Sequence, residues 1–537
     1  MATTHAFDAI IVGGGHNGLA AAAYLSRAGR KVLLLEKLDH PGGAAVSAQA
    51  FDGVEARLSR YSYLVSLLPQ QIIDDLGLRI TLARRRYSSY TPDPAEPGRA
   101  LLIDNEDAAS TAASFAAVGA SEDEFRAFND FYTSCGKLTQ ALWPTMTSPL
   151  PTRAAARQLA VRNGAADAWE AMIEQPVGLA IARALGHDLV RGVVLTDALI
   201  GTFARADDTD LQQNICFLYH LIGGGTGDWD VPIGGMGQVS GELEVAARRA
   251  GATVLTGVTV TRVTPDGEVT WSEHIGGLAN DSEGLPTGTE LTAQFDLVLS
   301  AVAPHVLGQL LGDEADAAPR PEGAQVKVNM LLSRLPRLRD GVAPEAAFGG
   351  TFHINEGYGQ LGRAYAEAVA GRVPDPLPCE IYCHSLTDPS ILGEDLRASG
   401  AQTLTVFGLH VPDRLLTRET NDRMRDELER AVVASLDSVL AEPIRPLLLE
   451  GAGGPAIETR TTLDIEDALA MPGGNIFHGP LSWPWLEQEA TSIAEAWGAE
   501  TRHPRILMAG SGARRGGAVS GIGGHNAAHA ALELLRP

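Results

Sequence analysis

The chain has 537 residues, of which 45% are hydrophobic and 20% are charged, and its formal net charge is −24 at pH 7. This length predicts two interleaved domains, because one hydrophobic core rarely serves so long a chain. The acidic balance argues against nucleic acid as a partner and against bulk adhesion to an anionic bilayer. The sequence contains no uninterrupted apolar run of about 18 residues, so no membrane-spanning helix is predicted. The first eight residues lack the basic and apolar regions of a secretion signal, so a cytoplasmic protein is expected.

The first predicted element is a buried parallel strand over residues 8–12, and the glycine-rich turn 13–18 follows it at once. An alanine- and leucine-rich helix is predicted over residues 19–28. A second strand over residues 31–35 leads directly to Glu36. Strand, glycine turn, helix, strand and acidic residue thus follow one another as in a dinucleotide-binding βαβ unit.

Each residue type in this unit has a physical role in holding a dinucleotide. Gly13 lets the chain turn tightly, Gly15 lets backbone approach a pyrophosphate, and Gly18 lets the helix pack closely against the strand. The helix N-terminus offers unpaired N–H groups to the phosphates. Glu36 can accept hydrogen bonds from ribose hydroxyls, and its charge would repel a 2′-phosphate.

A paired glycine follows the unit in the run Pro41-Gly-Gly-Ala44. At Gly42 and Gly43 the backbone can again lie close to a phosphate or ribose. NAD dehydrogenases do not require this addition, whereas flavoproteins with an extended dinucleotide motif commonly carry it. The sequence therefore favours FAD over NAD as the cofactor.

The middle of the chain predicts a second domain inserted into the first. Helical patterning dominates residues 76 to about 220, and strands alternate with charged helices from residue 306 to about 470. Between these stretches lie a strand over 254–263, a surface loop over 274–290 and a buried strand over 296–302. We expect an FAD-binding domain formed by residues 1–75, 226–305 and 471–537, and a substrate domain formed by residues 76–225 and 306–470.

The C-terminal part predicts another strand, loop and helix: a strand over 505–509, a loop of four glycines over 510–517 and a helix over 522–535. The N-terminal unit already accounts for the phosphates. The backbone N–H groups of this second strand, loop and helix would therefore suit the isoalloxazine end of FAD, whose pyrimidine edge gains negative charge on reduction. A plain crossover between a strand and a helix is the alternative interpretation.

Several of these motifs together resemble the phytoene-desaturase-like flavoproteins, and more narrowly the branch formed by pyridine nucleotide-disulphide oxidoreductase domain-containing protein 2 and its bacterial relatives. The resemblance extends from end to end. It rests on the N-terminal unit with its glycine pair, and on the runs Gly234-Gly-Met-Gly, Met471-Pro-Gly-Gly-Asn-Ile-Phe-His478, Gly510-Ser-Gly-Ala, Gly516-Gly517 and His525-Asn-Ala-Ala528. This sequence departs from many relatives in carrying Arg514-Arg515 where they have a His-Pro pair.

The resemblance implies non-covalent FAD and an α/β fold, with a Rossmann-like FAD-binding domain that is discontinuous in sequence and a second α+β substrate domain of mixed sheet and helices. Together with the motifs, it assigns cofactor binding to Gly13, Gly15, His16, Asn17, Gly18, Glu36, Lys37, Gly42, Gly43, Ala44, Val258, Gly510, Ser511, Gly517 and Val519.

Catalytic residues are less clearly indicated than cofactor-binding ones. Tyr219, His220 and Arg514 are weak candidates, and residues 59–63 could line the substrate side or serve as core aromatics. His525 and His529 lie one helical turn apart, but without a third ligand no metal site is expected.

Three functions fit the sequence. The leading hypothesis is a desaturase, dehydrogenase or oxidase that moves a hydride between flavin and a C–C or C–N bond of an apolar small molecule, with oxygen or a quinone as electron acceptor. The alternatives are a redox-neutral flavin isomerase and a non-catalytic, flavin-stabilised partner protein. Peripheral membrane contact, oligomeric state and substrate identity stay open at this point.

Overall fold

The computed structural model describes residues 7–273, 290–313 and 318–536. Within these residues, one sheet is fully parallel and has the strand order β21-β13-β1-β2-β9. Its strands are β1 Ala9–Val12, β2 Val32–Leu35, β9 Thr253–Leu255, β13 Leu297–Ser300 and β21 Ile506–Met508. All but β9 are buried along their whole length, as expected of parallel strands covered on both faces.

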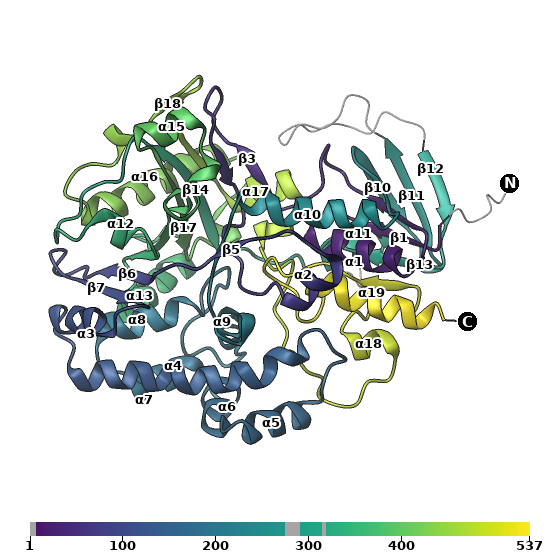
Figure 1. The fold of residues 1–537 in the computed structure, drawn as a ribbon, viewed down its shortest axis with the longest axis horizontal. Helices are drawn as coiled ribbons and strands as arrows, with labels where there is room; N and C mark the ends of the chain where they lie inside the picture. The colour runs from purple at the N-terminus through teal and green to yellow at the C-terminus, as the bar shows by residue number, and fades with distance from the viewer. Residues whose placement is uncertain (1–6, 274–289, 314–317, 537) are drawn as a thin grey trace.

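Helices cover one face of this parallel sheet, and a small antiparallel sheet covers the other. On the first face, α1 (His16–Arg27) packs between α10 (Met236–Arg249) and α19 (Ile522–Leu534) (Figure 1). The second face shares a hydrophobic core with the sheet of β10 Val258–Val263, β11 Glu268–Glu273 and β12 Glu290–Gln294. The α/β fold class with a Rossmann-like domain is therefore confirmed.

A mixed sheet forms the centre of the second domain, with the order β20-β14-β17-β16-β15-β6-β7 in the described part of the chain. Its strands are β6 Tyr87–Pro92, β7 Ala100–Asp104, β14 Gln325–Leu332, β15 Thr351–Ile354, β16 Cys379–Tyr382, β17 Gln402–Leu409 and β20 Ile457–Arg460. Only β15 and β6 pair in parallel among these strands. The helix α16 (Asn421–Val439) packs its apolar side on one face of the sheet.

Strand β14 shows how its sequence positions the site. Val326, Val328 and Met330 belong to the core shared with α16. Because side chains alternate along a strand, Gln325 and Lys327 point to the opposite face. Both line the main cavity of the protein.

A layer of helices lies beside the mixed sheet and below it in the view of Figure 1. These helices are α3 Ala108–Ala117, α4 Glu122–Leu142, α5 Arg153–Arg162, α6 Ala166–Ile173, α7 Val177–Ala184, α8 Asp188–Thr196 and α9 Gln212–Ile222. No helix in the described ranges is long and apolar enough to cross a membrane.

The described residues contain further α-helices and strands outside these groups. They are β3 Ser47–Gln49, β4 Arg57–Ser59, α2 Gln70–Leu76, β5 Leu82–Ala83, β8 Val231–Pro232, α11 Pro304–Leu311, α12 Pro344–Ala347, α13 Tyr358–Val369, α14 His384–Thr387, α15 Glu394–Ser399, β18 Glu450–Gly451, β19 Gly454–Pro455, α17 Thr462–Leu469 and α18 Ile493–Trp497.

The helix expected over 19–28 begins earlier in the structure, at His16. The stretch 254–263 is two strands rather than one, because the chain leaves the parallel sheet after Leu255 and enters the antiparallel sheet at Val258. The predicted surface loop 274–290 lies outside the described residues except for Glu290, which begins β12. Elements from all three segments of the expected FAD-binding domain meet in the parallel sheet.

Candidate functional site: a cavity between the two domains

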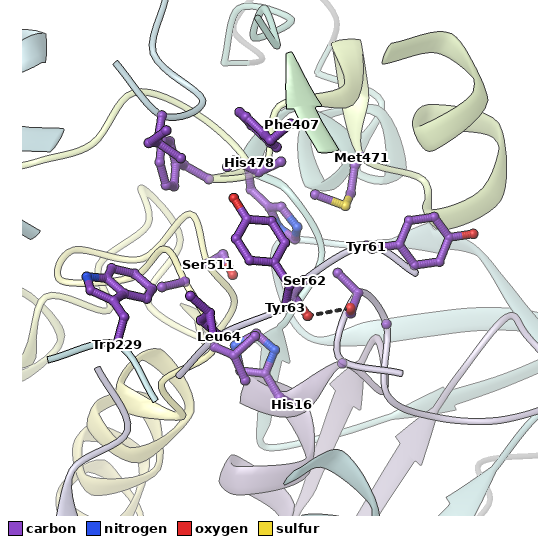
Figure 2. Close-up of a pocket in the computed structure, with 18 of the residues that line it drawn as sticks. His16, Tyr61, Ser62, Tyr63, Leu64, Trp229, Phe407, Met471, His478 and Ser511 are labelled. Atoms are coloured by element: carbon purple, nitrogen blue, oxygen red, sulfur yellow. Dashed lines mark hydrogen bonds between the residues drawn. The ribbon is translucent and has the colours of Figure 1, made fainter. Parts of the chain in front are cut away.

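One cavity of about 630 Å³ connects the parallel sheet with the mixed sheet. At one end it is lined by the glycine turn after β1 and by Glu36 after β2. At the other end its walls come from the mixed sheet and the helical layer. Figure 2 shows His16 at the first end and Phe407 and Met471 across the cavity from it, with Tyr63 between them.

The glycine turn is built so that its middle residue faces open space. A side chain on Gly18 would begin 2.2 Å from the carbonyl oxygen of Gly13, so this position holds the helix against the strand. At Gly15, in contrast, an added Cβ would meet no heavy atom within 4 Å. Gly15 also caps the N-terminus of α1 with φ −65°, a conformation open to any residue. The space beside Gly15 therefore belongs to the cavity, where a ligand can approach the backbone.

Glu36 is buried, with 8% of its surface exposed, and both of its carboxylate oxygens accept backbone hydrogen bonds. Its Oε2 accepts from the amide of Gly14 at 2.6 Å, and its Oε1 accepts from the amide of Leu38 at 2.8 Å. Burial raises the pKa of this carboxyl group, and the amide donors oppose that shift. Each carboxylate oxygen keeps a second acceptor direction, so the group can hold the glycine turn and still accept from a ligand hydroxyl.

Most of the predicted cofactor-binding residues lie on the wall of this cavity. They are Gly13, Gly15, His16, Asn17, Gly18, Glu36, Lys37, Gly43, Ala44, Val258, Ser511 and Val519. Ser62, which the same wall includes, donates from its hydroxyl to the carbonyl of Ala44 at 2.6 Å (Figure 2). The assignment of these residues to a cofactor stays a prediction.

Three of the predicted residues lie behind the wall rather than on it. Gly42 donates its amide to the carbonyl of Gly14 at 2.8 Å and shapes the turn. Gly510 packs against Ala301, where an added Cβ would begin 2.6 Å from the carbonyl oxygen. Gly517 has φ +85° and faces Leu481 and Phe477. These glycines position the backbone around the cavity and do not line it.

Of the three weak catalytic candidates, His220 alone lies on the wall of the main cavity. Burial lowers the pKa of this histidine to about 4. Tyr219 points elsewhere, because its hydroxyl donates to the carbonyl of Ser482 at 2.8 Å.

Arg514 lines a separate cavity of about 280 Å³, where it contacts Glu500 at 3.3 Å. Its neighbour Arg515 is 1% exposed and donates to backbone carbonyls of Thr145, Ser148 and Trp497. Neither Tyr219 nor Arg514 is therefore retained as a catalytic candidate.

Sequence reasoning missed a buried lysine at the centre of the cavity. Lys327 is 2% exposed, its Nζ donates to the carbonyl of Tyr61 at 2.9 Å, and the same atom lies 4.0 Å from the ring centroid of Tyr63. Burial lowers the pKa of this amino group well below its ordinary value. The signal was present, because Gln325, Lys327 and Asn329 alternate with apolar residues along β14.

Sequence reasoning also missed the polar group at the far end of the cavity. Glu380 on β16 accepts from the hydroxyl of Tyr382 at 2.5 Å and from that of Thr196 at 3.0 Å. Burial raises the pKa of Glu380. Arg85, Asp197 and His353 line the same region. These residues come from separate segments, so no local motif could have joined them.

The parallel sheet, the glycine turn and Glu36 define a dinucleotide-binding protein of the Rossmann-like class, and the attached mixed-sheet domain defines a two-domain oxidoreductase fold. Residues 11–70 match the family model of the NAD(P)-binding Rossmann-like domain. This match covers the βαβ unit and the glycine pair.

The chain belongs to the same family as a mycobacterial protein to which it is similar over nearly its whole length, and it is homologous to pyridine nucleotide-disulfide oxidoreductase domain-containing protein 2. It is 56% identical to the protein Rv0897c of Mycobacterium tuberculosis, over 98% of this chain and 97% of that protein. It is 28% identical to pyridine nucleotide-disulfide oxidoreductase domain-containing protein 2 of Rattus norvegicus, over 99% of this chain and 94% of that protein.

Solved structures share the fold at low sequence identity. A variant of putrescine oxidase aligns over 99% of both chains with a TM-score of 0.57 and 18% identity. Cyclohexylamine oxidase from Brevibacterium oxydans aligns over 99% of this chain and 100% of that chain, with a TM-score of 0.53 and 17% identity.

Proposed function

We propose that this protein is an FAD-dependent oxidoreductase that transfers a hydride between flavin and a C–C or C–N bond of an apolar small molecule. The observation that carries the proposal is the continuous cavity that joins the glycine turn and Glu36 to an apolar chamber lined by Tyr63, Phe407 and Met471. A dinucleotide bound at the first end would extend toward that chamber. Bound FAD would supply the hydride acceptor or donor, which the protein itself lacks.

The residues at the nucleotide end fit this group. The open side of Gly15 leaves room for a pyrophosphate, and the N-terminus of α1 supplies backbone N–H donors beside it. The free acceptor directions of Glu36 suit ribose hydroxyls. The glycine pair at 42–43 extends the motif in the manner that favours FAD, and the bridge between Gly15 and Gly42 joins the two glycine segments.

The walls at the other end suit an apolar substrate with few polar contacts. Tyr63, Phe407 and Met471 provide apolar surface and exclude water from the chamber. The amino group of Lys327 fixes the backbone at Tyr61 and, with its lowered pKa, can accept a proton at Nζ. A base near the substrate suits desaturation, because loss of a hydride from one atom requires loss of a proton from its neighbour.

Known proteins support both bond types that we propose. Putrescine oxidase and cyclohexylamine oxidase, which share the fold, act by name on amines. The phytoene-desaturase-like flavoproteins that the motifs resemble favour a C–C bond. We further propose a cytoplasmic enzyme that passes electrons to oxygen or a quinone and binds no nucleic acid.

Anaerobic mixing of the purified holoprotein with candidate amines and unsaturated lipids tests the proposal. We expect one FAD per chain and bleaching of the flavin absorbance by at least one substrate class. Turnover without net bleaching would instead show a redox-neutral isomerase. A flavin that dithionite reduces but no substrate class bleaches or converts would favour the non-catalytic, flavin-stabilised protein.

A further inference from the structure

Three buried side chains converge at the far end of the cavity. His353 lies on β15, Glu356 follows that strand, and Glu380 lies on the neighbouring β16. They are 4%, 0% and 2% exposed. One ligand atom from each can be chosen so that all three lie within 4.8 Å of one another. Nothing in the proposed hydride transfer uses this group.

Glu356 is the unusual member of the group. Both of its carboxylate oxygens are buried and have no hydrogen-bond partner. Its Oε2 lies 3.9 Å from Nδ1 of His353, too far for a hydrogen bond. A buried carboxylate without a partner is costly, so it must gain a proton or a cation.

The backbone conformation of Asn355 places Glu356 in this position. Asn355, directly before it, has φ +61°, a left-handed conformation that asparagine adopts more readily than most residues. The side-chain amide of Asn355 donates to the carbonyl of Leu377 and to the hydroxyl of Ser435, each at 3.1 Å. These two bonds fix the turn that directs Glu356 back toward His353 and Glu380.

We propose that His353, Glu356 and Glu380 bind one divalent first-row transition ion of the Mn²⁺, Fe²⁺ or Zn²⁺ type. One imidazole and two carboxylates form a donor set that suits these ions. The charge of the ion balances the two carboxylates and leaves the buried group neutral. The proposal is independent of the flavin.

One tautomer of His353 suits this role. When Nδ1 carries the hydrogen, the hydroxyl of Thr91, 3.2 Å away, can accept from it and Nε2 is free to bind the ion. A ligating histidine commonly donates its other N–H in this way. Nε2 lies 4.0 Å from Oε1 of Glu380, and an ion about 2.0–2.2 Å from each atom fits between them. Tyr382 holds the other oxygen of Glu380.

The cavity gives an ion access to the group. His353 and Glu380 both line it, whereas Glu356 closes the site from behind. An ion that arrives through the cavity would therefore meet two ligands first and be secured by the third.

Metal analysis of the purified holoprotein tests this proposal without any substrate. We expect about one transition ion per chain by mass spectrometry. After removal of the ion with EDTA, titration with Mn²⁺ followed by electron paramagnetic resonance should show one tight site. Glu356→Gln, which keeps the side-chain shape, should weaken Mn²⁺ binding more than tenfold while FAD content stays the same.

A matched variant tests whether ion binding depends on these three residues or on any carboxylate that lines the cavity. Asp230 lines the same cavity outside the group, and its Oδ1 is also buried without a partner. Asp230→Asn should retain the ion, and Glu380→Gln provides a second ligand variant if Glu356→Gln does not fold. Absence of a tight Mn²⁺ site in the parent protein, or a site that the ligand variants leave intact, would overturn the proposal.

Discussion

Glu36 connects the protein backbone with the proposed ligand at a single side chain. Its carboxylate accepts from Gly14 and Leu38 and also lines the cavity. Replacement by alanine should weaken FAD binding, because each lost hydrogen bond to a charged acceptor contributes roughly 1.5–3 kcal/mol. Fluorescence titration of the apoprotein with FAD measures the change. Glu36→Gln, which keeps one acceptor oxygen, should fall between the parent and alanine, and parent-like affinity in both variants would contradict the role.

Two glycines of the turn should respond differently to the same substitution. Gly15→Ala places a methyl group in open space at an ordinary φ, so the stability of the apoprotein should stay within about 0.5 kcal/mol of the parent. FAD affinity should fall sharply, because the methyl group occupies the approach of the pyrophosphate. Thermal unfolding with and without FAD measures both effects.

Gly18→Ala is the matched control for that variant. Its methyl group would lie 2.2 Å from the carbonyl oxygen of Gly13, so we expect roughly 1–3 kcal/mol of lost stability even without FAD. Equal loss of apoprotein stability in both variants would show that Gly15 serves packing rather than ligand binding.

Two histidines beside the cavity should make the apoprotein sensitive to acid. Burial lowers the pKa values of His16 and His478 to about 4, whereas both would titrate near 6.5 in the unfolded chain. The unfolded state therefore binds more protons between pH 6.5 and 4, and stability falls as the pH falls through this window.

His478→Asn should remove part of this acid sensitivity. Asparagine tolerates the φ of +65° at this position. The loss of stability between pH 7 and pH 4 should shrink by about 1–3 kcal/mol, measured by urea unfolding at each pH. An unchanged pH dependence would show that His478 is not buried in its neutral form.

At the scale of elements, the loop between β21 and α19 lies beside the cavity through Ser511 and Val519. Its position near the isoalloxazine stays a prediction. Ser511, whose Oγ lies 3.4 Å from the side-chain amide of Asn17, offers a milder test than Gly517, where the φ of +85° would strain any replacement. Ser511→Ala should shift the flavin reduction potential and change FAD affinity less than threefold. Gly15→Ala should instead lower FAD affinity without shifting the potential. If Ser511→Ala also lowered FAD affinity without shifting the potential, this loop would lie at the phosphates.

The elements also show what the sequence could predict. The strands of the βαβ unit were predictable within one residue at each end, whereas α1 begins at His16, three residues before the predicted start of the helix. The unit could be found because its strand, turn and helix are encoded locally. The group around Lys327 and Glu380 was not, because pairing of β14, β17 and β16 brings these residues together from segments far apart. Glu356 escaped notice for another reason: its position depends on the positive φ of Asn355, which no sequence pattern announces.

At the scale of the whole molecule, the described residues contain one parallel sheet with one glycine turn of the dinucleotide-binding type. With FAD there, no second nucleotide fold is available in this part of the chain for nicotinamide. NADH and NADPH should therefore reduce the flavin slowly, which stopped-flow absorbance measures directly. Dithionite is the control that shows the flavin can be reduced. Rapid stoichiometric reduction by NADH would contradict this prediction.

The contact between α1 and α19 has a consequence for biosynthesis. The alanines of α1 are buried partly by a helix that the ribosome delivers roughly 500 residues later, which takes about 25–100 s at typical translation rates. Strands β9, β13 and β21 arrive in the same interval, so the nascent N-terminal unit cannot close its sheet. We therefore expect the FAD site to be completed only after α19 has been synthesised, and the faces of the βαβ unit that α19 covers to stay exposed until then.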